Sequence, residues 1–467
     1  MKPSKVTRRA EGRGRLEGVP NESARVRTQR RVALKPQLIR VNMAARKDRR
    51  AKFTALLHHV TPDALRCTFH RLRRSAAAGV DGVTTSEYER DLQQRLQDLH
   101  ERVQSGRYRA LPVRRVWIPK SDSGQRPLGV PALEDKIVQG AVAEVLSAVY
   151  EADFLGFSYG FRPGRSPHQA LESLHTAVMT QSVNWVLDAD VRSYFDSIDH
   201  ELLLRAVSHR IADRRILRLI RIWLRAGVLE NKEWKETRKG VPQGAGISPL
   251  LSNIFLHYVL DKWFQKWRRH DARGRVVIVR FADDWVMGFQ YRADAVKMRS
   301  ALGHRLRECS LELHPEKTRL IEFGRLPAIC RQRRGQRRPQ TFAFLGFTHY
   351  CGWTRDGRFV CKRKTQGSRL SRKLRAVKME ARRRMHRPVA EQYRWLSAVL
   401  RGHYRYFGLP SNHRALNSFH HQVRRIWYRA LRRRSQRGLT QSAFWEIESR
   451  HPLPRPRMPK VQRSLFA

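Results

Sequence analysis

Residues 276–289, with the sequence VVIVRFADDWVMGF, constrain the fold of this chain more than any other segment. An apolar run that favours β-structure leads to Arg280 and Phe281. Two acids follow at Asp283 and Asp284, and a second apolar run begins at once, so the pattern predicts a β-hairpin with two carboxylates at its tip. Because Asp is frequent in turns, the pair alone is compatible with an ordinary solvated turn, and only further acids beside it would indicate a site.

The charge of the chain points to a polyanionic partner. The sequence has 95 Lys and Arg residues against 41 Asp and Glu, which gives a net charge of +54. The basic residues are spread along the chain and interleaved with aromatic residues. This favours nucleic acid over the alternative polyanion, an anionic membrane surface bound through one amphipathic helix. With 467 residues, 41% of them hydrophobic, the chain can form two or three domains with substantial cores.

The five cysteines form no CxxC pair, so we expect a reducing compartment and neither a zinc knuckle nor a disulfide framework. No apolar run approaches the roughly 18 residues that would span a bilayer, and the N-terminus has no apolar signal-peptide region. We therefore expect no membrane association and a cytoplasmic location, beside the nucleoid in a bacterial cell.

A third acid stands at the end of another predicted strand. Residues 185–191, WVLDADV, have the pattern of a short buried strand that carries Asp188 and Asp190. A carboxylate on a buried strand is costly unless it is paired or binds a metal ion. We therefore expect Asp190 to lie beside Asp283 and Asp284.

Three carboxylates on neighbouring strands can hold two divalent cations about 4 Å apart, the arrangement used for in-line attack at phosphorus. One ion would lower the pKa of an attacking 3′-hydroxyl group, and the other would stabilise a pyrophosphate leaving group. Mg²⁺ suits a site made only of carboxylate oxygens, and Mn²⁺ is the expected substitute.

Two further segments offer groups that suit a nucleotide. Residues 108–129 predict two paired strands around a turn, with Lys120 and Arg126 on either side of it, where both cations can close over a triphosphate. In so basic a chain, contacts to a phosphate backbone or surface positions are the alternative for both. The segment KGVPQGAGISP, residues 239–249, has small residues that let a ligand approach the backbone, just before a helix that begins at Ser248. The alternative is a tight loop before a core helix.

The two ends of the chain differ from its middle. Residues 1–50 are rich in Arg and Lys and lack a sustained apolar period, which predicts a basic arm that stays disordered until it meets RNA. An organelle transit peptide is the weaker alternative. Residues 311–321 and 342–350 have the pattern of strands, separated by an Arg-rich loop at residues 331–338. Basic helices with an apolar stripe begin at about residue 362 and predict a second, all-helical domain before an irregular tail.

These blocks occur together and in the order of a known family. The segments RPLGVP, SYGFRPGRS, DADVRSYFD, KGVPQGAGISPLLSN, RFADD, HPEKT and FLGF resemble the successive motifs of reverse transcriptases, specifically those encoded by group II introns. The helical region around RGHYRYFGL resembles their maturase domain. The resemblance covers roughly residues 55–435. It implies an α+β fold of the right-hand polymerase type, in which fingers and a palm with an antiparallel sheet precede an all-helical thumb or maturase domain.

The resemblance also divides the chain into parts. We expect a basic arm at residues 1–50, fingers with the start of the palm at 51–185, the palm at 186–350, the helical thumb or maturase domain at 351–440, and a tail at 441–467.

The roles of the site residues follow from the resemblance. It implies that Asp190, Asp283 and Asp284 are the metal-binding catalytic residues and that the carbonyl group of Val191 completes the shell of one metal ion. Phe195 occupies the place of an aromatic residue that excludes the 2′-hydroxyl group, which implies deoxynucleotide substrates.

Lys120 and Arg126 match the cations on the incoming triphosphate, and Gln243 matches the Gln beside the nascent base pair. Phe281 stands where the family most often has Tyr, and we expect activity to survive the loss of that hydroxyl group. Too few residues follow the maturase region for a Cys/His-rich HNH endonuclease, so we expect no second-strand cleavage and another source of primer.

The resemblance implies an RNA-directed DNA polymerase that also binds its intron RNA as a maturase, assists splicing and copies the RNA into DNA during intron mobility. The expected partners are the structured intron RNA, as template and ribonucleoprotein partner, a DNA primer or target, and dNTPs. Two alternatives remain. One is a domesticated relative in phage defence or CRISPR spacer acquisition, and the other is a splicing-only maturase, against which the intact aspartates argue. The sequence leaves the oligomeric state open.

Overall fold

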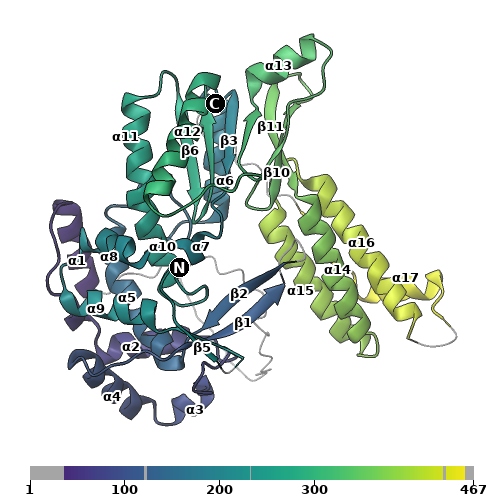
Figure 1. Cartoon of the computed structure of the whole chain (residues 1–467). Helices are drawn as coiled ribbons and strands as arrows, with labels where there is room; N and C mark the ends of the chain where they lie inside the picture. The colour runs from purple at the N-terminus through teal and green to yellow at the C-terminus, as the bar shows by residue number, and fades with distance from the viewer. Residues whose placement is uncertain (1–35, 120–123, 232, 435–437, 458–467) are drawn as a thin grey trace, which may run out of the picture.

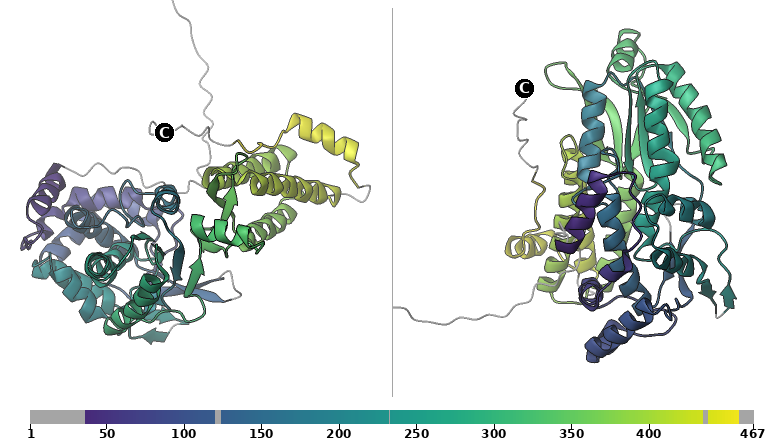
Figure 2. Two further views of the ribbon diagram at one scale, coloured as in Figure 1. Left: turned by 90° about the horizontal axis from the view of Figure 1, so that it is seen from above. Right: turned by 90° about the vertical axis from the view of Figure 1, so that its left-hand side faces the viewer.

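The computed structural model describes residues 36–119, 124–231, 233–434 and 438–457. Within them, helices surround three separate sheets, so the chain is a mixed α+β protein, as the sequence predicts. The helices of the N-terminal part and those of the C-terminal part lie on opposite sides of the molecule, and a sheet with its covering helices, formed by the middle of the chain, lies between and above them (Figure 1). The view from above in Figure 2 shows the same separation.

The central sheet contains the hairpin predicted at residues 276–289. Its strand order is β6-β7-β3-β8, and all neighbouring strands are antiparallel. The strands are β3 (Trp185–Ala189), β6 (Val276–Phe281), β7 (Asp284–Phe289) and β8 (Arg319–Glu322). The hairpin and the strand before Asp190 are therefore confirmed. The strand predicted at residues 311–321 is wrong in its bounds, because only residues from Arg319 onwards pair with β3.

Alternate side chains of the central sheet enter two different cores. Leu187, Trp285 and Met287 belong to the larger core. Side chains from most of the helices before about residue 310 also enter this core. Val186 and Val286 point the other way and belong to a second core, shared with the three-stranded sheet described below. Because both faces of the sheet are covered, its inner strands are almost continuously apolar in sequence.

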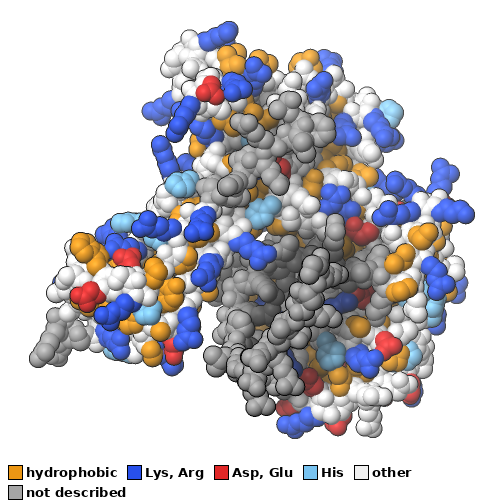
Figure 3. Space-filling model, turned by 180° about the vertical axis from the view of Figure 1, so that it is seen from behind, with side chains coloured by type: hydrophobic (Ala, Val, Ile, Leu, Met, Phe, Trp, Pro, Cys, Tyr) orange, Lys and Arg blue, Asp and Glu red, His pale blue; other side chains and the backbone are white. Residues whose placement is uncertain are grey.

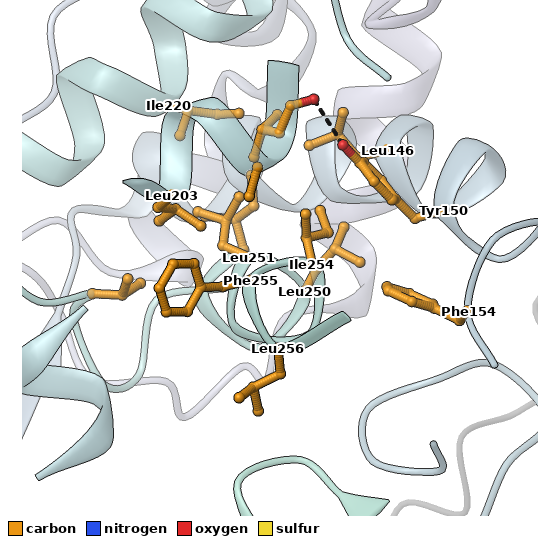
Figure 4. Packing of buried hydrophobic residues seen from close by; sticks show 14 of the residues in the cluster. Leu146, Tyr150, Phe154, Leu203, Ile220, Leu250, Leu251, Ile254, Phe255 and Leu256 are labelled. Atoms are coloured by element: carbon orange, nitrogen blue, oxygen red, sulfur yellow. Dashed lines mark hydrogen bonds between the residues drawn. The ribbon is translucent and has the colours of Figure 1, made fainter. Parts of the chain in front are cut away.

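Helix α10 (Ser248–Leu256) runs through the middle of the larger core. Every residue of it from Leu250 onwards is buried. Figure 4 shows Leu251 and Phe255 of this helix packed among side chains of other helices. At one side of the cluster the Tyr150 hydroxyl group donates a hydrogen bond of 2.8 Å to a backbone carbonyl group, so its polar tip is satisfied (Figure 4).

The other helices of the N-terminal and middle parts, except α6, form the walls of this core, whereas the buried residues of α6 belong to the second core. With α6 included, these helices are α1 (Pro36–Lys47), η1 (Leu57–His59), α2 (Pro62–Arg71), α3 (Thr85–Arg90), α4 (Leu92–Gln104), α5 (Leu133–Tyr150), α6 (Pro167–Thr180), α7 (Tyr194–Ser197), α8 (His200–Ser208), α9 (Arg214–Arg225), the π-helix η2 (His257–Asp261), α11 (Lys262–His270) and α12 (Arg292–Glu308).

Helix α1 corrects the prediction of a disordered arm up to residue 50. Leu38, Val41 and Ala45 recur at helical spacing, are buried, and join the larger core. The Asn42 amide group donates a hydrogen bond of 2.7 Å to the Ala148 carbonyl group of α5. The density of Arg and Lys around these few apolar residues hid the helical period in the sequence. The rest of the predicted arm, residues 1–35, lies outside the described residues.

A second sheet has the strand order β2-β1-β4-β5. Its strands are β1 (Val113–Pro119), β2 (Gln125–Val130), β4 (Val228–Glu230) and β5 (Glu233–Lys235). The predicted antiparallel pairing of β1 with β2 is confirmed. β4 adds to the other edge of β1 in parallel.

A third sheet, with the order β11-β10-β9, shares the second core with the central sheet. Its strands are β9 (Phe342–Phe344), β10 (Phe347–Trp353) and β11 (Phe359–Thr365). Two predictions are wrong here. Part of the Arg-rich segment predicted as a loop is helical, in α13 (Arg325–Arg333), and the helices begin only at Gly367, because β10 and β11 extend the sheet past residue 351.

The C-terminal bundle consists of α14 (Gly367–Arg383), α15 (Val389–Phe407), α16 (His413–Arg432) and α17 (Gln441–Arg450). It has a core of its own, built around Leu396, Phe419 and Trp427. α17 falls in the segment predicted as a tail. Lys and Arg side chains are scattered over the bundle and over the rest of the face in Figure 3, with few acids among them. Among the described helices, none is both long enough and apolar enough to cross a lipid bilayer.

Candidate active site

The register of the central sheet brings the predicted acids to one end of it. β3 pairs with β7 from Trp185↔Phe289 to Ala189↔Trp285. The next positions along these two antiparallel strands are Asp190 and Asp284, so these acids are neighbours across the strand pair. Asp283 precedes Asp284 in the turn of the hairpin.

The carboxylates are close enough to disturb one another. Burial raises the pKa of Asp284 to about 7, and the charges of Asp283, Asp188 and Asp190 add to this rise. The backbone N–H group of Leu345 acts in the opposite direction. Burial also raises the pKa of Asp188, although Arg319 opposes that rise. A buried carboxylate with further acids beside it is an arrangement that a cation would stabilise.

Two cations from the segment leading into β8 lie against these acids. Lys317 Nζ is 3.4 Å from an Asp190 carboxylate oxygen, and Arg319 Nη2 is 3.1 Å from an Asp188 carboxylate oxygen. The backbone N–H group of His314 donates a 2.8 Å hydrogen bond to the Asp190 carbonyl group. The HPEKT motif therefore lies at the site and holds the end of β3 in place.

A buried ion pair lies beneath the tip of the hairpin. Arg280 is fully buried; its Nε is 2.8 Å and its Nη2 2.5 Å from the two carboxylate oxygens of Asp261. Its third nitrogen, Nη1, donates to the Asn253 side-chain carbonyl group at 2.9 Å and to the Ala282 backbone carbonyl group at 3.0 Å. Asp261 ends the π-helix η2 between α10 and α11. The guanidinium group thus ties the residue before Asp283 to the central helix of the core.

The backbone at that residue is held from the other side by the SYGF loop. Ala282 has a φ of +58°, which is strained for a residue with a side chain. A Cβ atom on Gly160 would lie 2.2 Å from the Ala282 nitrogen, so only glycine allows this approach. The Asn253 amide group donates a hydrogen bond of 2.7 Å to the Gly160 carbonyl group. The SYGF loop therefore contacts both helix α10 and the tip of the hairpin.

Phe195 and Gln243 lie on segments that are bonded together. Phe195 belongs to the short helix α7 and is partly buried against the larger core. Its carbonyl group accepts a 2.8 Å hydrogen bond from the Val241 N–H group, and the Gln243 carbonyl group accepts one of 2.7 Å from Gly129 of β2. The loop of residues 239–246 therefore connects the start of the acid-bearing segment with the second sheet.

A hollow of about 280 Å³ lies between this loop and the second sheet. It is lined by Arg115, Asp196, Arg238 and Gln243, among others, so its wall is polar and carries cations. Such a wall suits a phosphate or a nucleotide.

Not every predicted site residue is placed in relation to the acids. Val191, the residue after Asp190, is buried and forms an isolated β-bridge with Leu313. Arg126 pairs with Ile118 in the backbone of the β1–β2 hairpin. Lys120 lies outside the described residues.

Reasoning from the sequence missed the groups that hold the hairpin. Arg280 was noted only as the end of an apolar run, Asn253 fell within the helix predicted to begin at Ser248, and Asp261 was not considered. One signal was available: an Arg that interrupts an otherwise apolar strand needs a buried acid as partner. Which acid supplies that charge depends on how α10, η2 and α11 pack, which no local pattern gives.

The acids alone do not form a closed metal cage. Throughout residues 36–119, 124–231, 233–434 and 438–457, no group of three or more His, Cys, Asp or Glu side chains converges closely enough to hold a metal ion. The burial and the neighbouring acids that raise the pKa of Asp284 nevertheless fit a site whose remaining ligands come from a substrate.

Comparisons with known proteins agree with this geometry. Residues 118–349 match the family described as reverse transcriptase (RNA-dependent DNA polymerase). Protein YkfC of Escherichia coli (strain K12) is 38% identical over 252 residues, which cover 47% of this chain and 66% of that protein. The group II intron-encoded protein LtrA of Lactococcus lactis subsp. cremoris is 35% identical over 213 residues, 45% of this chain and 35% of LtrA. The putative COX1/OXI3 intron 2 protein of Saccharomyces cerevisiae is 36% identical over 171 residues, 36% of this chain and 20% of that protein.

A central antiparallel sheet that carries neighbouring aspartates at one end, together with the match over residues 118–349, defines the class: these residues form a domain of the reverse transcriptase family. Its relatives include a group II intron-encoded protein, as the sequence motifs predict, and a putative intron protein of yeast. The matches cover between 20% and 66% of the length of these three relatives, so the chain is similar to part of each.

Proposed function

We propose that this chain is an RNA-directed DNA polymerase that also binds a structured intron RNA as a maturase, assisting its splicing and copying it into DNA during intron mobility. One observation carries the proposal: the pairing of β3 with β7 sets Asp190 beside Asp284, at the end of the sheet where the hairpin presents Asp283. The similarity to a group II intron-encoded protein supports the choice of substrate.

Asp190, Asp283 and Asp284 would hold two Mg²⁺ ions, or Mn²⁺ in their place, with the Val191 carbonyl group as a further ligand. Bound ions would supply positive charge for a reacting 3′-hydroxyl group and for departing pyrophosphate. Two side chains near the carboxylates hold the site in place. Arg280 fixes the backbone of the tip, and Lys317 holds the Asp190 side chain before the substrate arrives. The polymerase would thus receive its substrate in a site whose carboxylates are already placed.

The loop of residues 239–246 and helix α7 would select the nucleotide. Gln243 lines the hollow beside the second sheet, and Phe195 is fixed to the same loop through its carbonyl group. We assign Gln243 to the nascent base pair, Phe195 to the exclusion of a 2′-hydroxyl group, and Lys120 and Arg126 to the triphosphate. The substrates would be dNTPs.

The architecture would be that of a right hand. We assign residues 51–185 to the fingers with the start of the palm, 186–350 to the palm and 351–440 to the thumb or maturase domain. The thumb would grip RNA through exposed cations of the C-terminal bundle. On α14 these are Arg369, Arg372, Lys373, Arg375, Lys378, Arg382 and Arg383. An enzyme of this kind would act in the cytoplasm, beside the nucleoid.

Primer extension tests the polymerase. Purified protein with Mg²⁺ should extend a DNA primer on an RNA template, and Asp283→Asn should abolish extension while RNA binding stays within about twofold of wild type. Asp356→Asn is the matched control, because this acid is exposed in a surface ion pair with Arg358. Extension that persists in Asp283→Asn would contradict the assignment of the site.

A splicing assay tests the maturase activity. The protein should accelerate splicing of a group II intron precursor RNA at low Mg²⁺, and the Asp283→Asn variant should do so equally well, since RNA folding does not need the polymerase site. A wild-type protein that extends primers but leaves splicing unchanged would retain the polymerase and remove the maturase from the proposal.

A further inference from the structure

The motif HYRYFGL, residues 403–409, has the look of an RNA-binding segment because it is basic and aromatic and lies in the maturase-like region. The structure places it at the C-terminal end of α15, where the C-terminal bundle meets the third sheet. Tyr406, Phe407 and Leu409 pack against the second core. Phe407 lies 5.1 Å from Phe347 of β10 between ring centroids. The apolar residues of the motif therefore pack between the C-terminal bundle and the core shared by the central and third sheets.

Tyr406 makes polar contacts to two other elements in this region. Its hydroxyl group donates a hydrogen bond of 2.8 Å to the Leu345 carbonyl group. Its own carbonyl group lies 2.8 Å from Nε2 of His168, in the first turn of α6. One residue of the bundle is thus bonded both to the SYGFRPGRS–α6 segment and to the turn between β9 and β10.

That turn is tight and strained. Leu345 has a φ of +48° and Gly346 a φ of +83°, the left-handed pair that a two-residue hairpin requires. A leucine is unfavourable in this conformation unless its surroundings hold it. The Tyr406 hydroxyl group bonds to the carbonyl group of this same leucine, so it holds the peptide that needs support.

The other side of Leu345 faces the acids. β9 lies against β7, and the Leu345 N–H group interacts with the Asp284 carboxylate. Asp284 also lies close enough to Tyr406 for the two groups to influence each other electrostatically. Three residues therefore form a line from the bundle to the proposed catalytic centre: the Tyr406 hydroxyl group, the backbone of Leu345 through its carbonyl and N–H groups, and the Asp284 carboxylate.

We infer that Tyr406 is a positioning residue, which fixes the orientation of the Asp284 carboxylate through the backbone of Leu345 and so couples the packing of the C-terminal bundle to the catalytic centre. The inference rests on the proposed function, because it names a further residue on which the polymerase depends. It assigns Tyr406 of the HYRYFGL motif to the support of the polymerase site rather than to direct contact with RNA.

The test compares full-length wild type with Tyr406→Phe in primer extension on an RNA template, alongside RNA affinity and the thermal denaturation midpoint. Loss of the hydroxyl group should lower kcat about three- to tenfold, the effect of one hydrogen bond on a barrier. The KM for dNTP and the affinity for RNA should stay within about twofold, because the ring and its packing remain. A purely structural role would lower the denaturation midpoint without this selective fall in kcat.

Tyr404→Phe is the control on the same helix. The Tyr404 hydroxyl group is buried, and within the described part of the chain it has no hydrogen-bond partner. This variant should keep the kcat of wild type. An unchanged kcat in Tyr406→Phe would overturn the inference, and so would a loss of RNA affinity that accounts for the whole effect, since Tyr406 would then be an RNA contact. A wild-type protein that extends no primer would instead overturn the proposed function, which separates the two failures.

Discussion

Replacement of Asp284 by Asn should make the protein more stable while it destroys activity. The pKa of Asp284 rises from its ordinary value of 3.8 to about 7 in the folded chain, through burial and the charges of neighbouring acids. A carboxyl group whose pKa is raised in the folded state does not reduce stability at a pH below its ordinary pKa. The free energy of unfolding then falls as the pH rises from the ordinary pKa to the folded-state pKa, and it levels off above that. Each pKa unit corresponds to about 1.4 kcal/mol, so the cost above pH 7 has an upper limit of about 4 kcal/mol.

The assay is urea denaturation of wild type and Asp284→Asn in the absence of divalent cations, at pH 5 and pH 8. The amide group has nearly the shape of the carboxylate and no charge, so the variant escapes the cost at both pH values. The gain in free energy of unfolding should be at most about 2 kcal/mol at pH 5 and should widen toward about 4 kcal/mol at pH 8. Added Mg²⁺ should stabilise wild type more than the variant, because binding of a ligand to the native state alone raises its stability.

Asp356→Asn serves as the surface control and should change the free energy of unfolding by no more than about 0.5 kcal/mol at either pH. An Asp284→Asn protein that is no more stable than wild type at pH 8 would refute the reasoning. It would mean that Lys317 or another cation already compensates the acids in solution.

Three further substitutions test the surroundings of the site. Arg280→Met should cost about 3–5 kcal/mol of unfolding free energy, because it leaves Asp261 as an unpaired buried charge, and the double variant Arg280→Met/Asp261→Leu should recover part of the loss in urea denaturation. Gly160→Ala should lower kcat at least tenfold in primer extension, because its Cβ atom would lie 2.2 Å from the backbone of the hairpin. Gly156→Ala is the control and should behave as wild type, because its Cβ atom would have no atom within 4 Å. Equal activities of the two variants would disprove the role of the contact between Gly160 and Ala282. Arg372→Gln on the exposed face of α14 should weaken RNA binding and reduce the dependence of log Kd on log salt by about 0.7–0.9, whereas an unchanged slope would exclude a phosphate contact there.

The hairpin and its acids could be predicted because their signals are local. The apolar runs around Asp283 and Asp284 have the length and composition of strands, and the turn residues stand between them. The strand before Asp190 is similarly clear. The expectation that these strands are neighbours came from the chemistry, since buried carboxylates need partners, and the register of β3 with β7 agrees with it.

The groups that support the hairpin could not be predicted because their signals are tertiary. Asp261 is one acid on a helix until the π-helix η2 turns it toward Arg280. Gly160 is one of several glycines in a loop until the hairpin approaches within contact of it. Tyr406 has the sequence context of an RNA-binding segment, and only the path of the chain sets its hydroxyl group on the turn that reaches Asp284.

The order of strands in the central sheet has a consequence for the synthesis of this protein. β3 is made first, but its neighbours β7 and β8 lie far along the chain, and β7 lies between β3 and β6. While a ribosome still holds the chain before β7, Asp190 has no partner acid, and the edge of β3 is open to other strands. Long-range pairing of this kind is slow to form. The C-terminal bundle, which emerges after the strands of all three sheets, contains the tyrosine bonded to the turn beside Asp284. A nascent or truncated chain should therefore be prone to aggregate, and full polymerase activity should appear only after the C-terminal bundle has folded.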